Sequence, residues 1–467
     1  MNERDIRRLR TFLEEAYRRK TPRSRALFRR AEKVMVGGGS HTLRLYHPYP
    51  FFVTRARGAE LRDADGRRYI DYWQGHYANI LGHNPKLILE GVRAALRGGA
   101  LHSGFESAVQ IELAELLVGS LGQPRWKVRF TTSGTLAAMY AVMLAKAVTG
   151  RELVLKIGGG WHGASPDLLK GVRYHDAAGF GAVESAGLAA DVFRRTLVTP
   201  FNDGDRLMQV FKTHGGRIAG FILEPYLGVG GFVPADPEYL DLARKLTRQH
   251  GSILIFDEVI SGFRLRPGPV FTLYGTAPDL AVFGKIIGGG HAVAAVAGRP
   301  EVMAGCGAGG RFPRVVFEGG TFSGHAEYMT AGAVMLRHLI RHEKSIYPRL
   351  AAFGRRLRQA IEDVFRSEGI EARTTGSGND VVPGGSLFMV HFPLRPGHVF
   401  RRPEDSMDER SAHLALREQT LKLALAVEGV HVVHGGGAIS VAHEERHLEK
   451  TVDAYRAAAR LFRKYLF

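Results

Sequence analysis

Cysteine is almost absent from this chain: Cys306 is the single thiol among 467 residues, so no internal disulfide can form. This composition fits a reducing compartment such as the cytoplasm. Long apolar runs are also missing, and no stretch approaches the ~20 apolar residues that a membrane-spanning helix needs. The N-terminal segment is rich in arginine and lacks the apolar centre of a secretory signal. We therefore expect a cytoplasmic protein without a membrane span.

Acidic residues are outnumbered as well: the chain has 46 Asp and Glu but 64 Lys and Arg, which gives a net charge of +18. Such an excess can indicate nucleic-acid binding. However, no nucleic-acid-binding motif accompanies the charge, and basic residues do not alternate with aromatic ones in any short window. We interpret the charge as a diffuse solvated surface that favours anionic small molecules, not nucleic acid.

The chain is too long for one small core, and its pattern divides it into three segments. Residues 1–84 contain an amphipathic helix and two short strands around a turn at 63–66. Residues 85–340 alternate apolar strands with helices, as in a parallel sheet covered on both faces, and include an expected mobile loop at 307–320. Residues 341–467 form a smaller unit. We expect an α/β fold with a large, mostly parallel sheet domain and a smaller α+β domain from the two chain ends. The strands expected in the central segment are 127–132, 152–157, 196–201, 217–225, 252–259 and 279–285.

Two uncharged motifs follow strands of this sheet, at the edge where such folds bind ligands. Ser133, Gly134 and Thr135 open a helix directly after a strand, so their backbone N–H groups and hydroxyls suit a phosphate. The alternative is plain N-capping, since Ser-Gly-Thr is a weak motif. Trp161, in “GGGWHG”, follows a strand and three glycines and is placed to stack on a flat ring. The alternative for Trp161 is a core or lid aromatic.

Two charged residues end strands of the same sheet. Asp257 ends the apolar run “LIFD”, and a buried carboxylate without a partner costs several kcal/mol, so it requires a cationic or hydrogen-bonding neighbour. Lys285 ends “LAVFGK”, where burial would lower the pKa of the amine, and a neutral amine can form a Schiff base. The alternatives are an internal salt bridge or a helix cap for Asp257, and a lysine that extends to solvent for Lys285. Glu258 points to the opposite side of the strand, so we do not expect it to pair with Asp257.

A lysine, a carboxylate, a phosphate cup and an aromatic ring together match the needs of one cofactor, pyridoxal 5'-phosphate. In this interpretation Lys285 carries the cofactor as a Schiff base and later transfers a proton. Asp257 keeps the pyridine nitrogen protonated, so that the ring acts as an electron sink. We expect no metal site.

Several stretches carry a family resemblance over nearly the whole chain, including “FTTSGT”, “WHG”, “FNDGD”, “LIFDEVISGFR”, “APDLAVFGKIIGGG” and “GGTFSG”. The chain resembles the class III (subgroup II) aminotransferases of fold type I, with an architecture like that of glutamate-1-semialdehyde 2,1-aminomutase. The resemblance implies an enzyme that acts on a small-molecule amino donor and a carbonyl acceptor. It also implies a homodimer with shared active sites.

The resemblance assigns a role to each matched position. It implies that Lys285 is the Schiff-base lysine and that Asp257 pairs with the pyridine nitrogen. Arg44 matches the arginine that binds the substrate carboxylate, and Gly320 and Thr321 match the segment that reaches the phosphate of the neighbouring subunit. The further cofactor contacts that it implies are Ser133, Gly134, Thr135, Trp161, His162, Asn202, Glu224 and Val259.

Three activities fit this pattern. The first is an aminotransferase that moves an amino group between an amino acid or amine and a carbonyl acceptor. The second is a glutamate-1-semialdehyde 2,1-aminomutase of tetrapyrrole biosynthesis, and the third is an amino-acid racemase or epimerase. Near the C-terminus, where this class often has an arginine and the aminomutase a glutamate, the chain has Gly435 beside His434. A basic nucleic-acid-binding protein on a disused enzyme fold would have no reason to keep Asp257 and Lys285 at strand ends.

Overall fold

A seven-stranded sheet forms the centre of the computed structural model, which describes residues 3–307 and 314–466. The strands β11, β10, β7, β5 and β6 run parallel, whereas β12 is antiparallel to both of its neighbours. The predicted α/β class and the mostly parallel sheet are therefore confirmed. In spatial order the strands are β4 (Lys127–Thr131), β12 (Ala294–Gly298), β11 (Leu280–Phe283), β10 (Ile253–Asp257), β7 (Ile218–Leu223), β5 (Leu153–Ile157) and β6 (Thr196–Thr199).

The strands at the centre of this sheet are buried along their whole length, which explains their continuous apolar sequences. Strand β12 was not expected from the sequence, because its “AAVAG” run has weak strand propensity. Hydrogen bonding to a strand on each side holds it in the sheet. Of the loop expected at 307–320, residues 308–313 lie outside the described part of the chain, and residues 314–320 have no regular structure.

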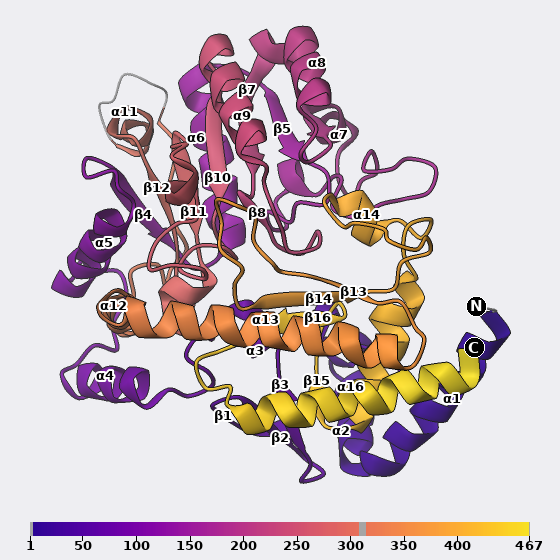
Figure 1. Ribbon diagram of the computed structural model, residues 1–467. Coiled ribbons are helices and arrows are strands. Elements are labelled where there is room, and N and C mark those ends of the chain that lie inside the picture. Colours follow the sequence, from indigo (N-terminus) through magenta and orange to yellow (C-terminus); the bar gives the residue numbers. More distant parts are fainter. Residues whose placement is uncertain (1–2, 308–313, 467) are drawn as a thin grey trace.

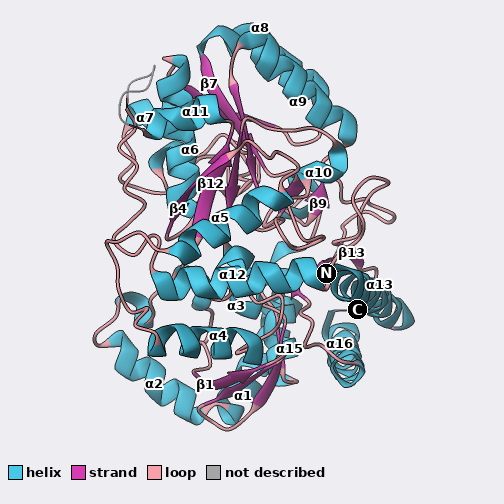
Figure 2. Cartoon of the chain, turned by 90° about the vertical axis from the view of Figure 1, so that its left-hand side faces the viewer, coloured by secondary structure: helices cyan, strands magenta, loops and turns pink. Residues whose placement is uncertain are grey.

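Helices cover both faces of the sheet (Figures 1 and 2). Two of them, α8 and α9, pack on one face, and α6 packs on the other with α11 beside it. The helices that follow strands in this part of the chain are α6 (Gly134–Thr149), α7 (Ala190–Arg195), α8 (Gly204–His214), α9 (Pro237–His250), α10 (Phe271–Tyr274) and α11 (Pro300–Met303). A short hairpin, β8 (Tyr226–Leu227) and β9 (Val233–Pro234), follows β7.

The two chain ends meet in a second group of sheets and helices. Strand β15 (Val430–His431) pairs in parallel with β3 (Arg68–Asp71), so residues far apart in sequence share one sheet. That sheet continues with β2 (Glu60–Asp63), across the expected turn, and then with β1 (Val53–Arg57), so three strands stand where two were expected. The other small sheet contains β13 (Arg373–Thr375), β14 (Leu387–His391) and β16 (Gly436–Ala438).

Helices from both ends surround these small sheets, and Figure 1 shows the first and last helices side by side near the two termini. The first of them confirms the expected amphipathic N-terminal helix. The helices of the two chain ends are α1 (Glu3–Lys20), α2 (Pro22–Glu32), α3 (Gln74–Tyr77), α13 (Glu343–Ser367), α14 (Pro403–Met407), α15 (Lys422–Val427) and α16 (Glu445–Leu466). Three further helices lie in the central segment: α12 (Ala326–Arg341) packs against α4 (Lys86–Arg97) and α5 (Ala108–Ser120), and α5 also contacts β4.

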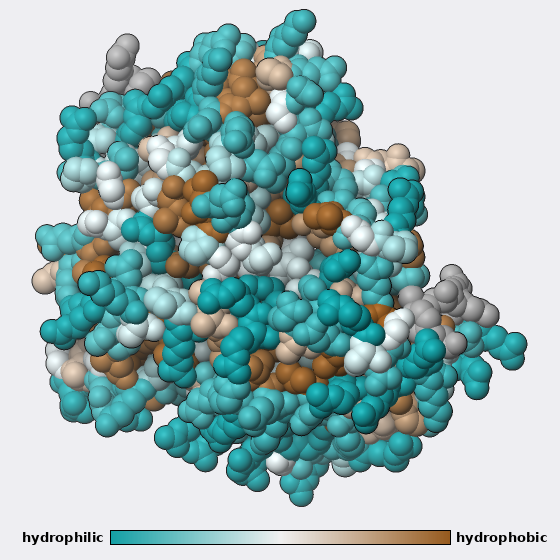
Figure 3. Space-filling view, viewed as in Figure 1, coloured by the Kyte–Doolittle hydropathy of each residue, from teal (hydrophilic) through white to brown (hydrophobic). Residues whose placement is uncertain are grey.

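The face seen in Figure 3 is largely hydrophilic, with separate apolar patches between hydrophilic side chains. Within residues 3–307 and 314–466, none of the helices combines the length and the apolar character needed to cross a membrane.

Candidate active site

Two carboxylates and an amine meet at the carboxyl ends of three neighbouring strands. Asp257 is the last residue of β10, Glu224 directly follows β7, and Lys285 begins the short helix η5 (Lys285–Gly288) after β11. Both carboxylates are buried, and Lys285 is half-buried. Burial lowers the pKa of Lys285 from 10.5 to about 8, although the charges of Asp257 and Glu224 act in the opposite direction. The site therefore holds a lysine whose neutral amine is accessible near physiological pH.

The partner that Asp257 requires is a histidine. Its Oδ2 lies 2.8 Å from Nδ1 of His162, and its Oδ1 accepts the backbone N–H of Val259 at 2.9 Å. Burial lowers the pKa of His162, which favours the neutral imidazole, while the hydrogen bond to Asp257 opposes that shift. Within the described residues, Nε2 of His162 has no hydrogen-bond partner. Asp257 is thus fixed from two sides, and each of its oxygens keeps a lone pair for a ligand.

Glu224 supports the loop that follows β5. It accepts the backbone N–H of Trp161 at 3.2 Å and that of Gly228 at 2.9 Å. Burial, and then the nearby charge of Asp257, raise the pKa of Glu224 to about 8. The indole of Trp161 is 37% exposed, so a planar ligand can still cover it.

Glu258, the neighbour of Asp257, belongs to a different set of contacts, as expected. It accepts a hydrogen bond from the hydroxyl of Ser261 at 2.5 Å and one from the backbone N–H of Phe271 at 2.9 Å. Burial raises its pKa to about 7. Glu258 is therefore a buried carboxylate of the same strand end whose described side-chain hydrogen bonds do not involve Asp257 or His162.

The start of α6 has the geometry of an anion cup. Ser133 caps the helix, since its Oγ accepts an amide N–H of the first turn at 3.3 Å. The amides of Gly134 and Thr135 have no acceptor in the described part of the chain. A Cβ at Gly134 would lie 3.0 Å from both methyl groups of Val259, so glycine lets the helix approach the strand end that carries Asp257. Oγ1 of Thr135 accepts the N–H of Ala164 at 3.4 Å, which joins the cup to the loop of Trp161.

Three expected positions, Asn202, Gly320 and Thr321, have no described hydrogen bond to Lys285 or Asp257. Asn202 donates to the carbonyl of Pro234 at 3.2 Å and accepts the N–H of Asp236 at 2.9 Å, and none of its described contacts reaches Lys285 or Asp257. Gly320 lies beside the cup of its own chain, because a Cβ there would be 3.1 Å from Oγ1 of Thr132. Thr321 is exposed. The roles inferred for these positions stay predictions.

Sequence reasoning missed the segment from Gln74 to Tyr77, which carries a histidine into the site. All four of its residues have positive φ, between 46° and 69°, which is costly for the three that are not glycine. Nε of Arg44 lies 3.5 Å from Nε2 of His76, and the ring of Trp73 lies 4.2 Å from the ring of His76. Burial, together with nearby cations that include Arg44 and Lys285, lowers the pKa of His76 to about 4. His76 is therefore a neutral imidazole between the two predicted functional cations.

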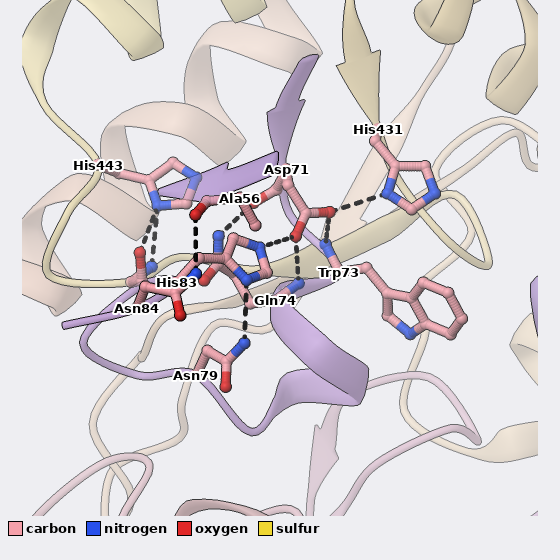
Figure 4. Close-up of polar contacts among 10 residues, drawn as sticks. Ala56, Asp71, Trp73, Gln74, Asn79, His83, Asn84, His431 and His443 are labelled. Atoms are coloured by element: carbon pink, nitrogen blue, oxygen red, sulfur yellow. Dashed lines mark hydrogen bonds and ion pairs between the residues drawn. The ribbon is translucent and has the colours of Figure 1, made fainter. Parts of the chain in front are cut away.

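A buried hydrogen-bond centre holds this segment in its strained conformation (Figure 4). The carboxylate of Asp71 accepts the N–H groups of Trp73 at 3.0 Å and of Gln74 at 2.9 Å. It also binds Nδ1 of His431 at 2.8 Å and Nε2 of His83 at 2.7 Å. Burial opposes the ionisation of Asp71, but the bonds to His431 and His83 keep its pKa below the usual range. Residues from both chain ends thus position the segment that reaches Lys285.

Known proteins match this chain over most of its length. The family described as aminotransferase class III matches residues 43–377. Glutamate-1-semialdehyde 2,1-aminomutase of Methanopyrus kandleri is 37% identical over 447 residues, which cover 95% of this chain and 98% of that protein. An omega-transaminase from Sphaerobacter thermophilus is 33% identical, with a TM-score of 0.81 over 94% of this chain and 97% of that one. A beta-phenylalanine aminotransferase from Variovorax paradoxus is 30% identical, with a TM-score of 0.82 over 97% and 96% of the two chains.

The residues at the strand ends fit the cofactor of this family. The free amides of Gly134 and Thr135 suit a phosphate, and Asp257 presents a buried carboxylate. Lys285 supplies an amine of lowered pKa, and Trp161 an exposed ring. The chain belongs to the class III aminotransferase family and is a pyridoxal-phosphate-dependent enzyme of fold type I.

Proposed function

We propose that this enzyme is an aminotransferase whose amino donor carries a carboxylate. The observation that carries the proposal is His76, which lies close to both Arg44 and Lys285. Arg44 is exposed, and its described hydrogen bonds go to His76 and to the hydroxyl of Ser40, at 3.2 Å. Among the described residues no carboxylate pairs with Arg44. An arginine without an internal counter-ion, in contact with the histidine that also faces Lys285, suits a substrate carboxylate.

Each residue of the site then has a chemical task. Pyridoxal 5'-phosphate, when bound, supplies an electron sink for charge at the substrate carbon. Lys285 would hold the cofactor, and its Nζ, with a pKa of about 8, suits proton transfer to and from substrate carbon near neutral pH. Asp257 would keep a proton on the ring nitrogen, since an anion favours the charged form of a base beside it. The residues that would enclose the cofactor are Ser133, Gly134, Thr135, Trp161, His162, Glu224 and Val259.

A glutamate-1-semialdehyde 2,1-aminomutase is the second candidate, because curated relatives of that name are up to 37% identical over nearly the whole chain. The resemblance leads us to expect a glutamate at position 435 in that enzyme, whereas this chain has glycine. A Cβ at Gly435 would lie 2.3 Å from Cγ of Arg417, so Arg417 fills the space of a side chain there. The guanidinium of Arg417 pairs with Glu418 at 2.8 Å. The missing glutamate argues against the aminomutase, while the same glycine also lacks the arginine that aminotransferases of this class often have there.

A matched pair of donors separates these functions. Enzyme loaded with pyridoxal 5'-phosphate is mixed with 3-amino-3-phenylpropanoate, or with 1-phenylethylamine, which has the same amine but no carboxylate. Bleaching of the yellow absorbance by the first donor, followed by transfer of the amine to a 2-oxo acid, supports the proposal. Conversion of glutamate-1-semialdehyde without any carbonyl acceptor would instead identify an aminomutase. Loss of optical activity with retention of the amine would identify a racemase.

Arg44→Gln is expected to raise KM for the carboxylate donor by about 10- to 100-fold, because it removes a charge-assisted hydrogen bond worth about 1.5–3 kcal/mol. The KM for 1-phenylethylamine should not change, since that donor has no group for Arg44. Steady-state kinetics with both donors measure the difference. Arg55→Gln, an exposed substitution on β1, serves as the control. Equal losses with both donors would show that Arg44 does not bind the carboxylate.

We also propose that two copies form a homodimer with shared active sites. Phe105 and Ile111 are 74% and 63% exposed, and Phe322, next to Thr321, is 55% exposed. Gln110 joins these segments, because its side-chain N–H groups reach the carbonyls of Phe105 at 3.1 Å and Gly324 at 2.7 Å. An apolar surface of this kind beside the predicted cross-subunit segment is typical of an interface.

Sedimentation should find a dimer, and the substitutions Phe105→Glu and Phe322→Glu together should yield monomers that lose the cofactor, because charges would enter the apolar contact. Circular dichroism checks that the monomers are folded. A fully active monomer would contradict the shared site.

A further inference from the structure

A fully buried lysine lies near Glu224 and His162 of the active site. Lys156 is on β5, and its side chain is 0% exposed. Its Nζ donates to three backbone carbonyls, those of Gly160 at 2.9 Å, Leu168 at 3.3 Å and Lys170 at 2.7 Å. Three carbonyl acceptors match the three N–H groups of an ammonium, whereas a neutral amine has two. The aminotransferase proposal gives this lysine no task.

The three carbonyls mark the two ends of one loop, residues 160–170. Near its start this loop carries Trp161 and His162, and Ala164 joins it to the anion cup. The segment that leads into it, Gly158–Gly160, has no side chains with which to pack. A Cβ at Gly160 would lie 2.8 Å from Nε2 of His162, so the backbone and the imidazole are closely fitted there. Lys156 therefore ties the start of the loop to its end, beside the backbone hydrogen bond from the N–H of Gly159 to the carbonyl of Gly171 at 2.9 Å.

The amine of Lys156 also acts on the site electrostatically. Burial lowers its pKa to about 7, while the nearby carboxylates of Glu224 and Glu184 raise it. The charge of Lys156 in turn lowers the pKa of His162, whose hydrogen bond to Asp257 acts in the opposite direction. Lys156 and Asp257 thus bias the protonation of His162 in opposite ways.

We propose that Lys156 is a positioning residue of this enzyme, which closes the neck of loop 160–170 and so fixes Trp161 and His162 against the bound cofactor. The proposal rests on the proposed function, since it takes Asp257 and Lys285 as the cofactor site. Lys156 acts through the loop, because its three described hydrogen bonds go to backbone carbonyls.

Lys156→Met tests this, because methionine fills similar space without an N–H donor. The variant is expected to lower kcat by about 10²-fold through misplacement of the loop, with a much smaller change in KM for the donor. The pH midpoint of the absorbance of the bound cofactor should also shift, because His162 and Asp257 would change their environment. Lys146→Met is the matched control, since Lys146 pairs with Asp167 of the same loop at 2.8 Å without reaching its neck. That control should keep the wild-type midpoint.

The outcomes separate the two proposals. A wild-type protein that cannot hold pyridoxal 5'-phosphate would overturn the aminotransferase assignment itself. A wild-type protein that holds it, together with a folded Lys156→Met variant of unchanged kcat and pH midpoint, would overturn only the role of Lys156. If Lys156→Met does not fold, Lys156→Gln replaces it, because the amide keeps two N–H donors. We expect Lys156→Gln to shift the midpoint in the same direction by less, and wild-type behaviour in it would equally reject the proposal.

Discussion

Lys285→Ala is expected to leave a folded protein that has lost amino-group transfer by about 10³-fold or more. The amine of Lys285 lies beside Asp257 and Glu224 and is the proposed attachment point of the cofactor. Lys156 cannot replace it, because the Lys156 amine is held by three carbonyls. Turnover and the absorbance of loaded protein measure the loss. Reduction of loaded wild-type protein with borohydride, followed by peptide mass analysis, should place the label on Lys285.

The pH dependence of cofactor attachment follows from the same residue. Burial disfavours the ammonium form, so the neutral fraction of Lys285 grows as the pH rises through about 8. The rate at which apoenzyme takes up pyridoxal 5'-phosphate should therefore rise with pH up to that value and level off above it. Lys146→Ala should show the wild-type profile.

Normal turnover by the Lys285→Ala variant would reject Lys285 as the attachment site.

Asp257→Asn is the second substitution with a large expected effect, a fall in kcat of about 10²-fold or more. Asparagine keeps the shape of the side chain, and its amide oxygen can still accept the N–H of Val259. What it removes is the negative charge that would hold a proton on the ring nitrogen. We expect weaker cofactor retention as well, measured by the absorbance that remains after dialysis.

Glu258→Gln supplies a closely matched control for Asp257→Asn. Glu258 is the next residue, is also buried and is also a carboxylate, but its contacts are with Ser261 and Phe271. This variant should change the melting temperature and leave the cofactor absorbance and its pH dependence unaltered. Equal losses of kcat in both variants would attribute the effect of Asp257→Asn to damage at the strand end instead of to charge.

Several elements of the protein could be predicted from local sequence alone, because burial imposes a recognisable pattern of apolar residues. A strand buried on both faces must be apolar throughout. Continuous apolar runs in the sequence therefore predicted the strands β5, β7, β10 and β11. The change from such a run to a charged residue marked Asp257 and Lys285, since a charge is tolerated where a buried strand ends. A serine and a glycine after a strand likewise marked the start of α6.

Contacts between residues far apart in the sequence could not be predicted from local sequence patterns. His162 and Asp257 are 95 residues apart, and only the side-by-side packing of β-strand ends brings them together. The left-handed turn from Gln74 to Tyr77 is a conformation that local sequence preferences disfavour. Asp71 holds this turn and also binds His431, which comes from the other end of the chain. Sequence by itself thus determined the strands and the charged residues that end them. The tertiary structure alone decided their partners, because a buried polar group is satisfied by whatever the fold places beside it.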